Sequence, residues 1–147
     1  MKDNAISVRI IDAKEIFTIL PLLQKLGNYL VPEATLKERL LEMTQQNYEC
    51  LGVYRTNVLI GICGLWFQTR HYAGRSIEMD HLIIDDAYRS NGIGKIIVDF
   101  VTDYAKKKLC NWIELNSYVN NFSSHKFFYK QGFVAKGFHF IKELDKS

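Results

Sequence analysis

The sequence has few of the features that would mark it as anything other than an ordinary globular protein. Only two of its 147 residues are proline, and no repeat or low-complexity segment interrupts it, which excludes collagen-like and disordered chains. No apolar run approaches the roughly 18 residues that a membrane-spanning helix needs, and residues 1–4 lack the apolar stretch of a signal peptide. We therefore expect a cytoplasmic protein with no membrane partner.

The chain also lacks a strong charge of either sign. Nineteen Lys and Arg against sixteen Asp and Glu leave a formal charge of +3, well short of the basic stripe of a nucleic-acid-binding protein, so we expect no nucleic-acid partner. Cys50, Cys63 and Cys110 are odd in number and stand in apolar surroundings, which predicts reduced core thiols. The histidines show no shared metal-ligand spacing, and no bound metal is expected.

What the chain does contain is enough apolar sequence for one core. Hydrophobic residues make up 48% of it and aromatic residues 13%, which predicts a single domain over residues 1–147. The order of elements is an α+β (mixed α/β) pattern around one sheet. Periodicity predicts strands over 6–11, 48–55, 58–69, 76–85 and 111–118, one or two more over 133–144, and helices over 16–26, 36–43, 92–109 and 122–131.

Three local signals sharpen the boundaries of these elements. Pro21 lies inside the first helical pattern and should kink or break that helix. Thr35 and Glu38 have the spacing of a capping box, which predicts the start of the second helix. The pair Thr56-Asn57 suits a hairpin turn between the second and third strands.

The most informative stretch is residues 78–95, EMDHLIIDDAYRSNGIGK, in which an apolar strand leads through a polar turn into a long helix. Gly92 and Gly94 have no Cβ, so an anion can approach the main chain closely at the helix start. The first amides of a helix lack partners there, and the helix dipole favours negative charge. Arg89 and Lys95 add positive charge at the rim. The stretch therefore predicts a phosphate or pyrophosphate site.

The spacing of these glycines excludes two common phosphate-binding motifs. The chain has no G-x-x-x-x-G-K-[ST] for a nucleoside triphosphate, and no G-x-G-x-x-G with a following acidic residue for a dinucleotide. A glycine-rich helix start that only packs tightly is the alternative that these residues leave open.

Two motifs together resemble those of the GNAT superfamily of acetyl-CoA-dependent N-acetyltransferases. Residues 89–94, RSNGIG, resemble the R-x-x-G-x-G pyrophosphate loop of that family. Downstream, Asn121, Phe128 and the pair Gly132-Phe133 resemble its pattern of Asn, a Tyr seven residues on, and Gly-Phe four residues later. Both motifs stand on the expected elements, and the resemblance covers most of the chain.

This resemblance implies a GNAT-like fold and a co-substrate. The fold is a central mixed sheet of about six or seven strands flanked by about four helices, in which a parallel strand pair splays apart to hold acetyl-CoA. By similarity, the pantetheine arm pairs with the main chain of Leu82, Ile83 and Ile84. Asn121 lies near that arm, and it can also cap the helix that follows. The pyrophosphate is expected on Arg89, Ser90, Asn91, Gly92, Ile93, Gly94 and Lys95.

The chemistry of acyl transfer needs a base that takes the proton of the attacking amine. Glu78 lies four residues before Leu82, where many members of the family carry a carboxylate base. On a strand, Glu78 shares a face with Asp80 and Leu82. His81 and Ile83 then face the other side, so His81 is expected to be structural. We expect Glu78 to act as the base and Asp80 to attract the amine; the alternative is that Glu78 is a solvated acid at a strand edge.

The sequence departs from the family pattern at the residue that usually protonates the leaving thiolate. That tyrosine should lie four residues before Gly132, where the chain has Phe128. Tyr129 is adjacent but about 100° away around a helix, and Tyr118 lies on the preceding strand. Both are candidate donors, and water is a third. A thiol of pKa about 8.5 also leaves tolerably well without a donor.

The amine acceptor is the least determined part of the prediction. Residues 64–89 and 137–144 look broadly like small-molecule acetyltransferases, including the aminoalkylphosphonate type, which favours a small-molecule amine as substrate. Arg70, His71 or Arg75 would then attract an anionic group of that amine. An aminoglycoside or polyamine would instead need an acidic pocket, which Glu33, Glu38, Glu42 and Asp80 could supply.

Two further readings of the family resemblance stay open. The acceptor could be a protein amine, or the chain could be a non-catalytic sensor that binds acyl-CoA, for which Phe128 gives some support. Family members often form homodimers, and the aromatic segment 133–140 is a candidate interface.

Overall fold

The computed structural model describes residues 5–145, and its elements follow the predicted order as far as the last helix. They form two compact units, one that ends at Leu115 and one that begins at Asn116; the single domain over residues 1–147 stays a prediction. The elements are β1 (Ile6–Ile10), the 3-10 helix η1 (Ala13–Ile19), α1 (Leu20–Leu26), α2 (Glu33–Thr44), β2 (Tyr48–Arg55), β3 (Val58–Arg70), β4 (Gly74–Ile84), the 3-10 helix η2 (Asp86–Tyr88), α3 (Ile93–Lys107), β5 (Trp112–Leu115) and α4 (Phe122–Lys130).

The first unit is built on one mixed sheet with the strand order β1-β2-β3-β4-β5. Its first four strands are antiparallel neighbours, and only β4 and β5 are parallel. The parallel pairing runs from Ser76 opposite Trp112 to Met79 opposite Leu115. Because β4 continues to Ile84, its residues 80–84 run on beyond the last β5 pair and have no partner in that strand.

Local sequence signals account for the connections around the first helices. Thr56 and Asn57 both have left-handed φ values, 46° and 63°, as a two-residue hairpin turn with the twist of its strands requires, so the predicted turn is confirmed. Pro21 divides the first helical pattern as predicted: η1 ends at Ile19, and α1 begins at Leu20 with the proline in its first turn, where its missing N–H costs nothing.

The capping box predicted at Thr35 and Glu38 is wrong. The second helix begins three residues earlier than predicted, at Glu33, with Pro32 as its N-cap and no side-chain cap. Thr35 therefore lies within the first helical turn, past the position from which a hydroxyl can cap the helix start.

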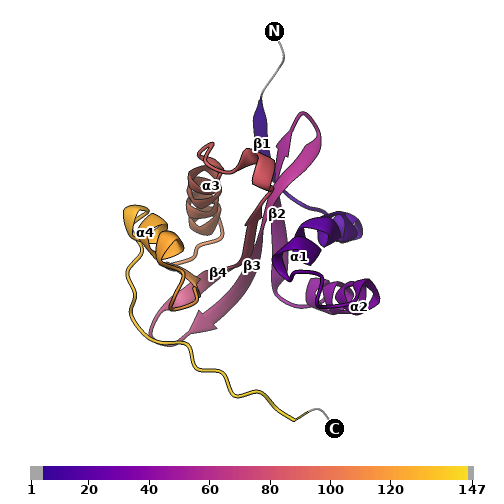
Figure 1. Cartoon of the computed structure of the whole chain (residues 1–147). Coiled ribbons are helices and arrows are strands. Elements are labelled where there is room, and N and C mark those ends of the chain that lie inside the picture. The colour runs from indigo at the N-terminus through magenta and orange to yellow at the C-terminus, as the bar shows by residue number, and fades with distance from the viewer. Residues whose placement is uncertain (1–4, 146–147) are drawn as a thin grey trace. The chain divides into compact units, whose positions relative to one another are not determined.

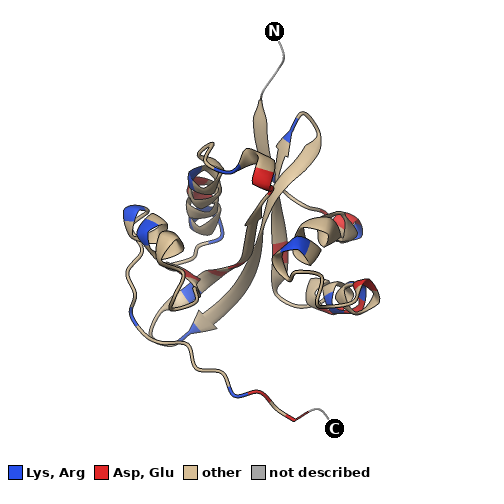
Figure 2. Ribbon diagram, viewed as in Figure 1, with Lys and Arg blue, Asp and Glu red and all other residues tan. Residues whose placement is uncertain are grey.

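The core occupies both faces of the sheet. On one face, η1, α1 and α2 pack over a cluster that includes Leu20, Leu40, Cys50 and Ile62. On the other face, α3 packs against β4 and β5 (Figure 1), and the apolar stripe that it buries comprises Ile93, Ile97, Val98, Val101 and Ala105. Most charged residues of this unit lie on its helices and loops, while its strands are mostly uncharged (Figure 2). Within residues 5–145, no helix is long and apolar enough to cross a membrane.

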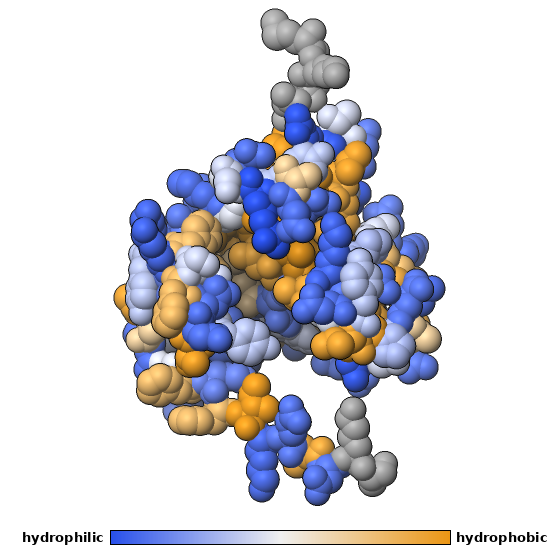
Figure 3. Space-filling view, in the orientation of Figure 1, coloured by the Kyte–Doolittle hydropathy of each residue, from blue (hydrophilic) through white to orange (hydrophobic). Residues whose placement is uncertain are grey.

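The prediction of strands over residues 133–144 is wrong, and with it the total of six or seven strands: the described part of the chain has five. Residues 133–145 have no regular structure. Phe133 is half-buried, but the large apolar side chains after it are exposed, from 67% at Val134 to 90% at Phe140, and Figure 3 shows hydrophobic residues along this segment. An alternating apolar pattern predicts a strand only where a sheet edge supplies hydrogen bonds and cover, and the pattern itself does not say whether one does.

Candidate functional site

The turn before α3 presents main-chain groups to solvent. Asp85 begins it, and its Oδ1 accepts a hydrogen bond from Ala87 N at 3.0 Å. Ser90 and Gly92 have left-handed φ values of 66° and 74°. Gly92 is the N-cap of α3, no side chain caps the helix, and a Cβ added at Gly92 would meet nothing within 4 Å. The first amides of this 15-residue helix are therefore open to an anion, in the positive field of the helix dipole.

The cations beside this turn are held by exposed carboxylates. Arg89 Nη2 lies 2.9 Å from Asp86 Oδ1, and Lys95 Nζ lies 2.7 Å from Asp99 Oδ2. All four side chains are more than half exposed. Exposed pairs of this kind contribute about 0–1 kcal/mol to stability, so both cations can exchange a carboxylate for a phosphate at little cost.

Glu78 and Asp80 lie on one face of β4, opposite Trp66 and Gly64 of β3. This is the face that η1, α1 and α2 cover, since Trp66 packs against their cluster. The Asp80 carboxylate is exposed but held: Oδ2 accepts from Trp66 Nε1 at 3.1 Å and Oδ1 accepts from His81 N at 2.8 Å. Glu78 is half-buried.

A β-bulge after Asp80 overturns two predictions from strand alternation. Ile62 pairs with Ile83 and Gly64 with Asp80, so two steps along β3 match three steps along β4. The extra residue puts Ile83 on the face of Glu78 and Asp80, where it joins the cluster of Ile62. Leu82 therefore does not share that face. The prediction from alternating side-chain faces fails here, because a bulge inserts one extra residue and so exchanges the faces of the side chains that follow it.

His81 also lies on the Glu78 face, not on the opposite one as predicted. Its φ is 33°, and its ring lies over Gly64: a Cβ on that glycine would be 2.1 Å from His81 Nε2. Tyr48 Oη lies 2.6 Å from the same nitrogen. The other ring nitrogen, Nδ1, is buried and has no hydrogen-bond partner among the described residues.

Sequence reasoning missed Glu114, which β5 places at the position paired with Glu78. Arg70 Nη1 lies 2.5 Å from Glu114 Oε2, and both side chains are mostly buried. Arg70, predicted to attract an anionic group, therefore has its charge engaged by a carboxylate. The only signal for Glu114 is the register of two parallel strands, which local sequence does not encode.

The cysteines are free, and none is activated as a nucleophile. Cys50 and Cys63 are buried, as predicted, while Cys110 is half-buried. Burial raises the pKa of the Cys50 thiol to about 12 and raises that of Cys63 as well. Because the thiolate is the reactive form, the two buried thiols serve packing.

The second unit carries the remaining predicted residues. Asn121 is the N-cap of α4, and its Oδ1 accepts from Ser124 N at 3.4 Å, so the predicted capping role is confirmed. Phe128 packs against Phe127 and Phe133, with ring centroids 5.3 and 5.6 Å apart. Tyr118 and Tyr129 are 82% and 58% exposed.

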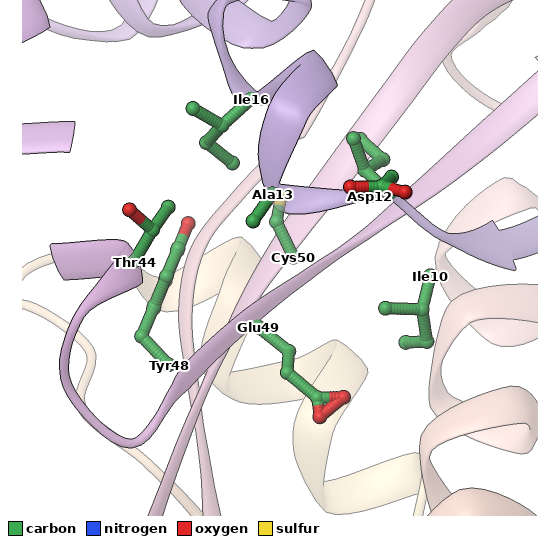
Figure 4. Close-up of a pocket in the computed structure, with 9 residues that line it drawn as sticks. Ile10, Asp12, Ala13, Ile16, Thr44, Tyr48, Glu49 and Cys50 are labelled. Carbon is green, nitrogen blue, oxygen red and sulfur yellow. The ribbon is translucent and has the colours of Figure 1, made fainter. Parts of the chain in front are cut away.

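A pocket of about 250 Å³ lies elsewhere, at the start of β2. Tyr48 and Glu49 point to opposite sides of that strand (Figure 4), and no residue of β4 or of the turn before α3 lines the pocket. Among residues 5–145, no group of three or more His, Cys, Asp or Glu is arranged to hold a metal ion.

Gly64→Ala tests how tightly the imidazole is packed. The added methyl would overlap the His81 ring, and overpacking of this kind costs about 1–3 kcal/mol. Urea denaturation should show a loss of that size. Gly27→Ala is the control, because its Cβ would meet only Leu23 O, at 3.7 Å; equal stability of the two variants would contradict the packing described.

The free energy of unfolding should decrease as the pH is lowered below the ordinary pKa of histidine. Burial lowers the pKa of His81 below 6.5, although the charge of neighbouring Asp80 opposes the shift; its other partner, Tyr48, stays neutral. Between the two pKa values the unfolded chain takes up a proton that the folded chain does not. The stabilisation that comes from the neutral, buried His81 is thus complete above pH 6.5 and is lost as the pH falls below that value. Denaturation of wild type and His81→Gln across this range should give converging stabilities, and parallel curves would refute the assignment.

Comparison with known proteins relates this geometry to one family. The model of the acetyltransferase (GNAT) family matches residues 16–133. The uncharacterized N-acetyltransferase YhdJ of Bacillus subtilis (strain 168) is 24% identical over 125 residues, which cover 84% of this chain and 88% of that protein.

Two solved structures show the same fold at low identity. The ribosomal-protein-alanine N-acetyltransferase of Brucella melitensis biovar Abortus 2308 matches with a TM-score of 0.81 and 18% identity, over 96% of this chain and 100% of that one. The aminoglycoside antibiotic 6'-N-acetyltransferase AAC(6')-Ih of Acinetobacter baumannii matches with a TM-score of 0.78 and 17% identity, over 96% and 100%. Because the family model spans most of the sequence, including β4 and the turn before α3, the chain belongs to the GNAT family of acetyltransferases.

Proposed function

We propose that this GNAT protein transfers the acetyl group of acetyl-CoA to a primary amine of a small molecule, by direct attack of the amine. The observation that carries the proposal is the structure of β4 and the turn after it. One strand bears Glu78 and then a stretch that has no partner in β5, and it leads to an uncapped helix start with open space at Gly92.

The residues of this region fit the co-substrate that the family uses. The open amides at Gly92, Ile93 and Gly94, with Arg89, Ser90, Asn91 and Lys95 around them, suit a diphosphate. The main chain of Leu82, Ile83 and Ile84 is where a pantetheine arm would pair. Asn121, which caps α4, is proposed to lie near the same arm. When bound, acetyl-CoA supplies a thioester whose C–S bond breaks as the new N–C bond forms.

Glu78 is the proposed general base. A primary amine is protonated near neutral pH and cannot attack until it loses that proton. A carboxylate that is half-buried on the sheet face can take the proton, directly or through one water. Asp80 adds negative charge beside it and favours approach of a cationic amine.

The leaving thiolate has no tyrosine at the usual position, which Phe128 occupies. Tyr129 and Tyr118 are the proposed alternatives, since both residues are more than half exposed, and water is the third. Turnover by Tyr129→Phe and Tyr118→Phe distinguishes them: a variant that keeps full turnover removes its tyrosine from the mechanism.

The charge balance favours a small cationic acceptor. Glu78, Asp80 and Glu114 bring three carboxylates to neighbouring strand positions, and the guanidinium of Arg70 is engaged by Glu114. This balance makes an anionic amine less suitable than the sequence suggested. By their names, the two solved relatives acetylate a ribosomal protein and an aminoglycoside, and a protein amine remains the alternative acceptor.

An acceptor panel tests the proposal. Purified protein is incubated with acetyl-CoA and amines of each class, and release of the coenzyme A thiol is followed, with product mass as confirmation. Turnover on a small amine supports the proposal, and turnover only on a peptide N-terminus or lysine supports the alternative. Binding of coenzyme A without turnover on any amine would favour the non-catalytic sensor.

A further inference from the structure

Four side chains from three strands meet at the bulge of β4. Tyr48 of β2 lies with its Oη 2.6 Å from His81 Nε2, and its ring packs on Trp66 of β3 with centroids 4.8 Å apart. Trp66 Nε1 donates to Asp80 Oδ2 at 3.1 Å, and Asp80 Oδ1 accepts from His81 N at 2.8 Å. The contacts form a closed ring of neighbours around the bulged residues, which we name the bulge cluster.

The bulge needs such support. His81 has a φ of 33°, in the left-handed region that is unfavourable for a residue with a side chain. Its imidazole fits only because Gly64, directly beneath it, has no Cβ. The two strands are thus complementary: Gly64 on β3 makes room for the His81 ring on β4. The hydroxyl of Tyr48 then holds that ring in place by a hydrogen bond.

What the bulge cluster controls is the direction of the strand beyond it. The bulge decides that Ile83 faces the cluster under α1 and that Leu82 does not. It also lies at the point where β4 continues past its last partner in β5. A shift of one residue would turn every main-chain N–H and C=O of residues 82–84 to the other side.

We infer that Tyr48 and His81 are positioning residues for acetyl transfer: their hydrogen bond holds the β4 bulge in register and so aims the main chain of residues 82–84 at the acyl donor. The inference rests on the proposed function. Neither side chain needs to touch the reacting atoms. Their contribution is to keep the thioester at the distance and angle that the amine requires, and small misplacements of this kind cost up to about 10²-fold in rate.

A second tyrosine of the same unit provides a matched comparison. Tyr104 of α3 donates its hydroxyl proton to Glu49, on the opposite side of β2 from Tyr48 (Figure 4). Tyr104→Phe and Tyr48→Phe therefore each remove one phenol hydroxyl from a partly buried hydrogen bond to a strand of the same sheet. Only Tyr48→Phe touches the bulge cluster.

The test is steady-state kinetics on these two variants with the amine found in the acceptor panel. Tyr48→Phe should lower kcat about tenfold or more, while the dissociation constant for coenzyme A, measured by calorimetry, stays within about threefold, because the diphosphate is bound at the helix start. Tyr104→Phe should retain wild-type kcat. Amide hydrogen exchange at residues 80–84 should quicken in Tyr48→Phe alone.

A purely structural role predicts a different pattern. If both variants lose stability and activity alike, or if Tyr48→Phe keeps full kcat, the inference is wrong. Should Tyr48→Phe not fold, the pair His81→Gln and His81→Leu replaces it. The Gln amide can form a hydrogen bond with the Tyr48 hydroxyl near the position of Nε2 and should retain kcat, whereas Leu cannot and should lower it. A wild-type protein that binds no coenzyme A would instead overturn the proposed function.

Discussion

Glu78→Gln is expected to slow acetyl transfer by about 10²- to 10⁴-fold near neutral pH, the range that a general base contributes. Glutamine keeps the size of the side chain and its place opposite Trp66, so the fold and coenzyme A binding should persist. The loss should shrink as the pH rises from about 7 toward the pKa of the amine, about 10, because a free amine needs no base. The measurement is kcat/KM for the amine against pH.

Glu114→Gln is the control for the loss of charge alone. Glu114 occupies the paired position on β5 and binds Arg70, so its neutralisation changes the field near Glu78 by a similar amount. We expect a rate within about tenfold of wild type and no change in the shape of the pH profile. If both variants lost the same activity at every pH, the carboxylates would act only by attracting the amine, and the base would have to be another group.

Gly92→Ala is expected to weaken coenzyme A binding about 10- to 100-fold, the loss of one charge-assisted hydrogen bond of about 1.5–3 kcal/mol. The methyl group would stand at the N-cap of α3, where a diphosphate is proposed to approach the main chain closely. Nothing in the described structure lies within 4 Å of it, so packing in the free protein is not disturbed. Isothermal calorimetry with coenzyme A measures the effect.

Gly132→Ala separates this effect from backbone strain. Gly132 also has a left-handed φ, 92°, and also has open space at its Cβ. Both substitutions should cost about 1–2 kcal/mol of stability, because a side chain disfavours that conformation. Only Gly92→Ala should weaken the affinity for coenzyme A. An unaltered affinity in Gly92→Ala would show that the turn does not bind the diphosphate.

Local signals were enough to predict most elements of the fold. Two strand-like runs on either side of a turn signal predicted β2 and β3 to within a residue of their ends, and the periodic apolar face of α3 predicted that helix to within two. Pro21 and the Thr56-Asn57 turn acted as expected because each fixes backbone dihedrals by itself.

Apart from the start of α2, which Pro32 sets locally, the features that the sequence did not predict depend on partners distant in the chain. The bulge at His81 follows from Gly64 and Tyr48 on two other strands. Glu114 reaches Glu78 only through the parallel register of β5. The apolar pattern of residues 133–144 predicted strands, but it could not show whether a sheet edge would receive them. The turn before α3, by contrast, could be predicted from the sequence, because a glycine, an uncapped helix start and a nearby cation are local properties.

The short β5 has a consequence for handling the protein. Residues 80–84 of β4 present hydrogen-bonding groups that β5 leaves uncovered, and a bare strand of this kind is a template on which another polypeptide can add. An occupant of the site would act as a shield against such self-association. Solubility and shelf life are then linked to ligand saturation, and coenzyme A in the storage buffer should keep concentrated samples from precipitating.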